Sequence, residues 1–299
     1  MASELVSPID PALRIDSVQL AVSDLSHSAD FYTRVLGLPL ISHDGRQALL
    51  GTDPRRPALV LLQLADPTPI PRGSTGLFHV AWLSPSRAAL AGALRRVTHN
   101  RWPIDGAADH GVSEALYLSD PDGLGIELYA DRPRARWERP PDGHGVKMVT
   151  LPLDIEDLLL AQTAADDMPT AAIGTGIGHV HLQVSDVPRA VTFYRDALGF
   201  EEQAQLPSAA FLSAGGYHHH VGLNAWHSRG GQPAPDSAPG LRHVVFELTG
   251  EQAVDALERR LSSTGAGPSP AHGEDGHLTL RDPDHQLLSF TSAAQTRTS

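Results

Sequence analysis

The chain has 299 residues, 41% of them hydrophobic, which is enough for about two domains with packed cores. Its formal net charge of −12, from 23 basic and 35 acidic residues, argues against a nucleic-acid partner or an anionic membrane, because both favour a basic face. The sequence has no cysteine, so disulfides and thiolate ligands are excluded. Any metal must be bound by carboxylates and by some of the sixteen histidines.

The first residues, MASELVSPIDPALRID, lack the basic-then-apolar layout of a signal peptide. No apolar run approaches the ~18 residues that a membrane-spanning helix needs. We therefore predict a cytoplasmic protein whose partners are small molecules, with neither nucleic acid nor membrane among them. A homo-oligomer is compatible with the sequence.

The chain contains an internal duplication. The segment IDSVQLAVSDLSHSADFYTRVLGL at 15–38 aligns without a gap with IGHVHLQVSDVPRAVTFYRDALGF at 177–200, with identity at ten of twenty-four positions. Each copy predicts an alternating strand, an aspartate cap (Asp24 or Asp186), and a helix whose Phe-Tyr pair and Leu share one face. Each half of the chain therefore begins with a strand followed by a helix.

A second pair of repeats follows the first. GLFHVAWL at 76–83 matches GLRHVVFEL at 240–248, and each leads into an amphipathic helix. Next come LYLSDPDGLGIELY and LTLRDPDHQLLSF, in which Asp-Pro-Asp is typical of a tight turn between two strands. Strand-like runs such as ALVLLQL at 58–64 complete the pattern, so we predict four βαβββ units in an α+β protein.

The repeats also predict how the chain is divided. We expect units one and two within residues 1–138, and units three and four within residues 173–292. Residues 139–172 form a connector rich in proline and charge, with a short helix at DIEDLLLAQ. Residues 293–299 form a tail.

Four such units, with a histidine on the first strand and DPDGxxIEL on the last, resemble the vicinal oxygen chelate superfamily, which includes glyoxalases, bleomycin-resistance proteins and extradiol dioxygenases. The stretches GHVHLQVSD, YHHHVGLN and SEALYLSDPDGLGIELYADRP are similar to the CatE-like catechol 2,3-dioxygenases within it. The similarity covers about residues 12–292. It implies two cup-shaped sheets, each made by two facing units, with a metal inside a cup.

The resemblance to ring-cleaving members also implies a ligand set. They use a first-strand histidine from each of two paired units and a last-strand glutamate from one of them. Two histidines and a carboxylate on one face of an ion leave positions open for a bidentate catecholate and dioxygen, which suits Fe(II), and Mn(II) is compatible. Unit two supplies His79 and Glu127, and unit three supplies His179. We call these three residues the candidate triad.

The pairing of units decides whether the triad can form. Unit one has Ser17 where the histidine belongs, and the offset of 162 places Ser289 of unit four where the glutamate belongs. Neighbouring units would therefore give two incomplete sites, whereas units two and three together give a complete one. We predict pairing 2+3 and 1+4, with His243 of unit four as a packing residue.

Three further residues fit the acid–base roles that the resemblance implies. Tyr117 lies ten residues before Glu127, as in relatives, and HHVGL at 219–223 resembles the strand whose first histidine is the base, here His219. His110 resembles the other histidine of the site, although its spacing to Tyr117 is two residues shorter. Histidine and tyrosine can move protons near neutral pH when their environment tunes them.

The other histidines leave alternatives open. Strand alternation directs His218 and His220 away from the face of His219, so at least one of them packs or lies at the surface. His181 shares the face of His179, where it either supports a ligand from behind or lines the cavity, and we favour the first.

The leading prediction is an extradiol dioxygenase that cleaves a catechol-type ring with Fe(II) and O2. A glyoxalase-like isomerase would need a second carboxylate, and the unit-three strand YHHHVGLN has no acid. A metal-free drug-binding protein would need only an apolar cup and would leave the candidate triad unexplained.

Overall fold

The computed structural model describes residues 8–141, 143–161, 169–264, 271–273 and 276–293. All but the first residue of the predicted tail at 293–299 lies outside the described residues. So does the part of the predicted connector at 142 and 162–168.

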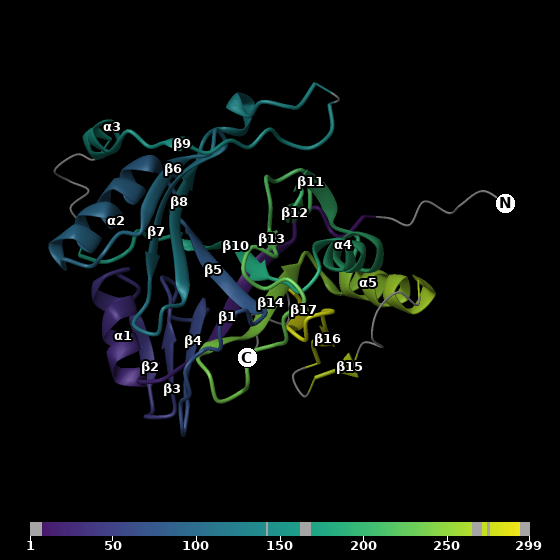
Figure 1. The fold of residues 1–299 in the computed structure, drawn as a ribbon, viewed down its shortest axis with the longest axis horizontal. Helices are drawn as coiled ribbons and strands as arrows, with labels where there is room; N and C mark the ends of the chain where they lie inside the picture. The colour runs from purple at the N-terminus through teal and green to yellow at the C-terminus, as the bar shows by residue number, and fades with distance from the viewer. Residues whose placement is uncertain (1–7, 142, 162–168, 265–270, 274–275, 294–299) are drawn as a thin grey trace.

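Units one and four form one sheet, which we call the outer sheet (Figure 1). Its order among the described residues is β15-β16-β17-β14-β1-β4-β3-β2. The strands are β1 (Arg14–Val22), β2 (Leu40–His43), β3 (Gln47–Leu50), β4 (Leu59–Gln63), β14 (Gly240–Leu248), β15 (Ala271–His272), β16 (Leu278–Arg281) and β17 (Leu287–Ser292).

Units two and three, with one short edge strand from the connector, form the other sheet, which we call the inner sheet. Its order among the described residues is β11-β12-β13-β10-β5-β8-β7-β6-β9. The strands are β5 (Gly76–Leu83), β6 (Gly106–Asp109), β7 (Ser113–Ser119), β8 (Gly125–Asp131), β9 (Leu151–Pro152), β10 (Gly176–Gln183), β11 (Glu201–Leu206), β12 (Ala209–Ser213) and β13 (Val221–Asn224). The predicted pairing of units, 2+3 and 1+4, is therefore confirmed.

In each sheet, the first strands of the two paired units lie side by side at the centre. In the outer sheet β1 runs antiparallel to β14, and in the inner sheet β10 runs antiparallel to β5. The second pair is in register with His181 opposite His79 and Val180 opposite Val80. Each half of the chain thus contributes one unit to each sheet.

The helices begin at the predicted caps. Asp24 accepts a hydrogen bond from the His27 backbone amide at 2.9 Å, and Asp186 accepts one from that of Arg189 at 2.8 Å. Figure 1 shows α1 and α2 on one side of the molecule, with α4 and α5 on the other. The helices are α1 (Leu25–Arg34), α2 (Arg87–His99), α3 (Ile155–Leu160), α4 (Val187–Thr192) with a π turn at Phe193–Ala197, α5 (Glu251–Thr264), and a 3-10 turn at Arg134–Arg136.

The repeated Phe-Tyr pair ties neighbouring units together. The Tyr32 hydroxyl donates to Asp120 at 3.1 Å, and its repeat, Tyr194, donates to Asp282 at 3.0 Å. Both aspartates open the Asp-Pro-Asp turns that the sequence singles out. A helix of one unit is therefore bound to the hairpin turn of the next unit, even though the two units belong to different sheets.

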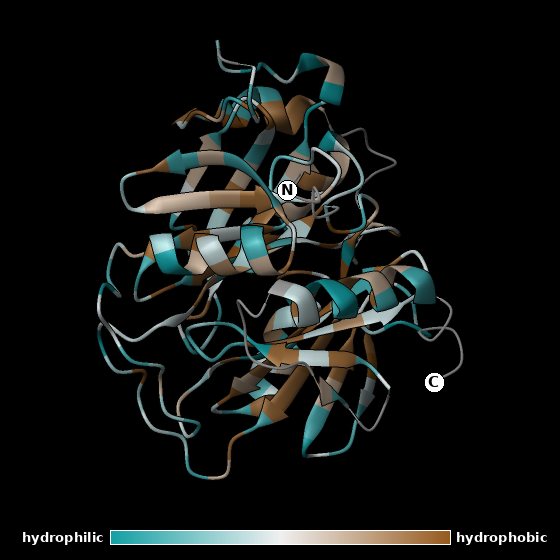
Figure 2. Cartoon of the chain, turned by 90° about the vertical axis from the view of Figure 1, so that its right-hand side faces the viewer, coloured by the Kyte–Doolittle hydropathy of each residue, from teal (hydrophilic) through white to brown (hydrophobic). Residues whose placement is uncertain are grey.

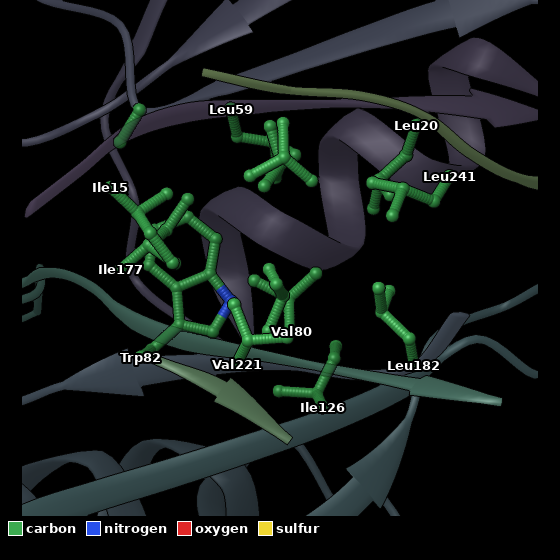
Figure 3. Packing of buried hydrophobic residues seen from close by; sticks show 14 of the residues in the cluster. Ile15, Leu20, Leu59, Val80, Trp82, Ile126, Ile177, Leu182, Val221 and Leu241 are labelled. Carbon is green, nitrogen blue, oxygen red and sulfur yellow. The ribbon is translucent and has the colours of Figure 1, made fainter. Parts of the chain in front are cut away.

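One hydrophobic cluster spans both sheets. Figure 3 shows Ile15, Leu20 and Leu59 of the outer sheet near Val80, Trp82 and Leu182 of the inner sheet. Figure 2 shows the hydrophobic residues gathered on the strands, while hydrophilic residues are frequent on helices and loops. Full burial of an aliphatic or aromatic side chain stabilises a fold by about 1.5–3 kcal/mol, so this shared cluster fixes the sheets relative to each other.

The opposite face of the inner sheet lies outside this shared cluster. Strand alternation turns Val80 toward the shared cluster and His79 and Ala81 away from it. A small separate cluster on that face contains Ala81, Ala115 and Tyr129. The small alanines leave room on this face for a cavity.

Candidate metal centre and active site

The three residues of the candidate triad lie on three adjacent strands of the inner sheet. His179 is on β10, His79 on β5 and Glu127 on β8. Ala81 of the central strand β5 pairs with His179 on one side and with Glu127 on the other. The methyl side chain of Ala81 leaves open the space above it, where the flanking side chains converge from either side.

The triad side chains meet at one point. Glu127 Oε2 lies 3.0 Å from His79 Nε2 and 3.0 Å from His179 Nε2. The three ligand atoms are all within 4.8 Å of one another, and all three residues are buried. Ligands at about 2.1 Å from an ion and about 90° apart would be separated by about 3.0 Å, so the two measured distances fit an octahedral edge.

The orientation of His79 also fits a metal. Its Nε2 atom is buried and has no hydrogen-bond partner among the described residues, although Glu127 Oε2 is close. A buried polar atom without a partner costs about 1–3 kcal/mol, so this placement needs a compensating interaction. A cation held together with Glu127 and His179 would supply that interaction.

The ionisation of the triad suits metal binding. Burial lowers the pKa of His179 to about 4, so its ring is neutral near pH 7. Burial alone would raise the pKa of Glu127, but His179 and His79 outweigh it and hold that pKa well below its ordinary value. A neutral imidazole and an ionised carboxylate are the states that bind metal ions.

A cavity of about 460 Å³ opens beside the triad. His79 and Glu127 lie in its wall, while His179 is buried behind them. All three predicted acid–base residues also line it, as does His181. Apolar side chains make up most of the remaining wall: Phe78, Ala108, Val112, Met148, Val149, Leu206, Phe211 and Trp226.

Sequence reasoning missed the aromatic wall and the part played by the connector. Phe78 precedes His79 of the candidate triad, close to a register shift of the β10–β5 pair, where simple alternation fails. Trp226 follows β13 in a loop, and Met148 to Thr150 come from the connector. No local pattern in the sequence brings these residues together.

Tyr117 and His110 form a hydrogen-bonded pair at the cavity. His110 Nδ1 lies 2.7 Å from the carbonyl oxygen of Val149, which only accepts, so Nδ1 carries the proton. In the neutral ring Nε2 is then the acceptor, and it receives the Tyr117 hydroxyl at 2.7 Å. Burial, and then the charge of Glu127, raise the pKa of Tyr117, so its hydroxyl stays protonated. The short spacing of His110 still allows it to reach Tyr117.

His219 lies against His179 of the candidate triad, with ring centroids 4.0 Å apart. Burial lowers its pKa well below the ordinary value, and the neighbouring histidines, His179 first, add to this. His218 and His220 do not line the cavity, as expected, but the strand alternation used to place them does not apply. Strand β13 begins only at Val221, and all three histidines are buried in the loop before it.

His181 lines the cavity, which is the less favoured of its two predicted positions. Its ring contacts Phe78 and Trp226, with centroids 5.1 and 5.6 Å away. Its ring fills the space beside Gly222, where a Cβ atom would lie 2.8 Å from His181 Cγ. Gly222 pairs with His181 as Glu127 pairs with Ala81, so glycine stands at the position equivalent to the triad carboxylate.

The outer sheet has no comparable ligand set among the described residues. His243 Nε2 lies 2.7 Å from the hydroxyl of Ser289, which in turn is 2.7 Å from that of Thr279. Within the described residues, two groups of side chains have the spacing of metal ligands: the candidate triad, and His179 with His218 and His219. Both groups belong to units two and three. His243 therefore has the hydrogen-bonded environment expected of a packing residue.

The two sheets of paired units and the convergence of two histidines with one carboxylate define a candidate metal-site architecture, and comparison with known proteins identifies the family. The sequence matches the Glyoxalase/Bleomycin resistance protein/Dioxygenase superfamily over residues 14–128 and 176–290. The chain belongs to this superfamily, as the repeated units predict.

Individual relatives agree with the family. The chain is 43% identical to a catechol-2,3-dioxygenase of Bacillus subtilis (strain 168) over 255 residues, which cover 84% of this chain and 88% of that protein. A solved structure from B. subtilis, described only provisionally as a dioxygenase, has TM-score 0.65 at 14% identity, covering 96% and 86% of the two chains. Glyoxalase I from Zea mays has TM-score 0.56 at 16% identity, covering 95% and 94%. At such low identity these two structures establish the fold alone.

In the described part of the chain, no helix is both long enough and apolar enough to cross a membrane.

Proposed function

We propose that the protein is an extradiol dioxygenase that cleaves the ring of a catechol beside its two hydroxyl groups and inserts both atoms of O2. The observation that carries the proposal is the convergence of His79, Glu127 and His179 beside an apolar cavity. The 43% identity to a catechol-2,3-dioxygenase supports the same reaction.

In this proposal His79, Glu127 and His179 hold Fe(II), and Mn(II) fits the same ligands. The bound ion would bring the two catechol oxygens and dioxygen together at the positions that the protein leaves open. Three protein ligands on one side are what make those positions available. The surrounding apolar wall excludes water from the reacting groups, which strengthens each electrostatic interaction there.

We assign acid–base work to three residues of the chain. His219 lines the cavity as a neutral ring and can accept a proton from a catechol hydroxyl. Tyr117 keeps its single proton, and its hydroxyl can turn that proton from His110 Nε2 toward oxygen that gains negative charge as the ring opens. Until the hydroxyl turns, His110 accepts its hydrogen bond and holds it at the cavity.

The cavity favours an uncharged catechol. Among the described residues that line it there is no lysine or arginine, and the one carboxylate present, Glu127, belongs to the triad. A substrate carboxylate would be desolvated there without a cationic partner from these side chains, which is costly. We therefore expect catechol and alkyl-substituted catechols to be better substrates than catechols that carry a carboxylate.

The competing isomerase function lacks a ligand. A four-ligand site with one carboxylate from each paired unit needs an acid at the unit-three position equivalent to Glu127, and Gly222 stands there. The His181 ring occupies the space in which such a carboxylate would lie. Metal-free binding would leave the buried Nε2 of His79 without a partner.

The test is an anaerobic titration with Fe(II), followed by addition of catechol and air. We expect uptake of O2 and the yellow colour of a ring-fission product. Iron binding without O2 uptake or product from any catechol would contradict the proposal. The cytoplasmic location and the homo-oligomer expected from the sequence stay predictions.

A further inference from the structure

A chain of polar side chains runs from the cavity wall toward the surface behind His219. His219 Nδ1 lies 2.8 Å from His218 Nδ1, and both rings are buried. On the far side of that ring, His218 Nε2 lies 3.0 Å from Asp131 Oδ1. The Asp131 side chain is 26% exposed, so the chain His219–His218–Asp131 links the cavity to solvent.

Asp131 is positioned by the strand that carries the triad glutamate. Glu127, Tyr129 and Asp131 alternate along β8 and face the same side of the inner sheet. The Tyr217 hydroxyl donates to Asp131 Oδ1 at 3.2 Å, and it also lies 2.7 Å from the Tyr129 hydroxyl. These contacts hold the carboxylate toward His218.

With both rings neutral, the hydrogen-bond pattern determines which nitrogen of each ring carries the proton. An ionised carboxylate only accepts, so His218 carries its proton on Nε2, facing Asp131. In a neutral ring, His218 Nδ1 is then an acceptor. Two ring nitrogens 2.8 Å apart need one proton between them, so His219 must donate from its own Nδ1. His219 Nε2 is left as a lone pair.

We propose that Asp131, acting through His218, fixes His219 in the tautomer whose Nε2 offers a lone pair to the cavity. Asp131 and His218 are positioning residues, because neither lines the cavity and each acts through its neighbour. The assignment of the tautomer stands on the hydrogen bonds between neutral rings and not on the proposed function. Its consequence for turnover rests on the proposed function, in which His219 accepts the catechol proton.

The first test observes the tautomer directly. Two-dimensional NMR of protein with ¹⁵N-labelled histidine distinguishes an Nδ1–H ring from an Nε2–H ring, with diamagnetic Zn²⁺ loaded in place of iron. His219→Gln identifies the His219 signals by removing them. We expect wild-type His219 as the Nδ1–H tautomer, and we expect Asp131→Asn to shift it toward a mixture. An Nε2–H ring in the wild type, or an unchanged ring in Asp131→Asn, would overturn the proposal.

The second test separates positioning from folding. Loss of a residue that orients a functional group from behind commonly costs about 10- to 100-fold, and we expect that fall in kcat for Asp131→Asn. Catechol KM and iron content should not change, because Asp131 touches neither the cavity nor the triad. Unchanged kcat alongside an altered tautomer would refute the link between the tautomer and turnover.

His220→Asn is the matched control. His220 is the third histidine of the same buried loop, and its Nδ1 accepts from the Ala214 backbone amide at 3.1 Å. The asparagine keeps an acceptor near that atom, so the His219 tautomer and kcat should both stay as in the wild type. The NMR measurement does not depend on turnover. Failure to cleave any catechol would therefore contradict the proposed function, while the NMR spectra would still confirm or overturn the tautomer assignment.

Discussion

Replacing Tyr117 by phenylalanine tests the acid–base assignment with the smallest possible change. The substitution removes the hydroxyl that donates to His110 Nε2 at 2.7 Å and keeps the ring that lines the cavity. Because the hydroxyl is not a ligand, the triad stays complete. Iron content should therefore equal that of the wild type.

Turnover should fall by about 10² to 10⁴ if Tyr117 supplies a full acid step, which is about 3 to 5 kcal/mol of transition-state stabilisation. The loss should appear in kcat rather than in KM for catechol, since the proposed metal ligation holds both catechol oxygens. Steady-state kinetics at saturating O2, with iron measured on the same samples, separates the two effects.

Tyr32→Phe is the matched control. It removes another buried tyrosine hydroxyl, whose partner Asp120 lies at a hairpin turn outside the cavity. This variant should lose stability and keep its turnover per bound iron. A Tyr117→Phe protein with full iron and wild-type kcat would refute the acid–base role.

Two further predictions concern stability. Burial raises the pKa of Asp120 to about 6, above 3.8 for the unfolded chain, so the folded state holds the proton more tightly. Stability is therefore lost as pH rises from about 4 to 6, by about 3 kcal/mol, and Asp120→Asn should gain that much relative to wild type between pH 4 and 7. If urea unfolding showed the same pH dependence of the unfolding free energy for wild type and Asp120→Asn across this range, the prediction would be contradicted. In Gly222→Ala the new methyl group meets the His181 ring, which should cost about 1–3 kcal/mol and raise KM for catechol. Gly106→Ala, whose Cβ meets nothing within 4 Å, is the control, and equal melting temperatures for the two variants would show that the ring yields freely.

The unit repeat and the pairing of units could be predicted from sequence because they depend on local, repeated signals. Alternating strands, aspartate caps and Asp-Pro-Asp turns recur at a fixed offset, and each is produced by nearby residues. Ser17 and Ser289 stand where a ligand histidine and glutamate would be needed, so pairing neighbouring units could not give a complete triad. The structure agrees with each of these predictions.

The rest of the site depends on contacts that leave no local pattern. Phe78 faces the cavity beside a register shift, and the Val149 carbonyl reaches His110 from the connector. His218 and His220 fall in a loop that the sequence reads as strand. Asp131 could have been found, because it lies four residues after Glu127 on the same strand face, but only the fold shows that His218 reaches it.

Metal content after removal of one histidine from each sheet tests the central claim, that units from different halves of the chain share one metal site. His179→Ala removes the only triad residue from the second half of the chain, whereas His243→Ala removes the first-strand histidine of the outer sheet. Measured after anaerobic loading and gel filtration, wild type and His243→Ala should each retain a single Fe(II) per chain, and His179→Ala should retain almost none. Retention of iron at the wild-type level in His179→Ala, or its loss in a folded His243→Ala protein, would contradict the shared site.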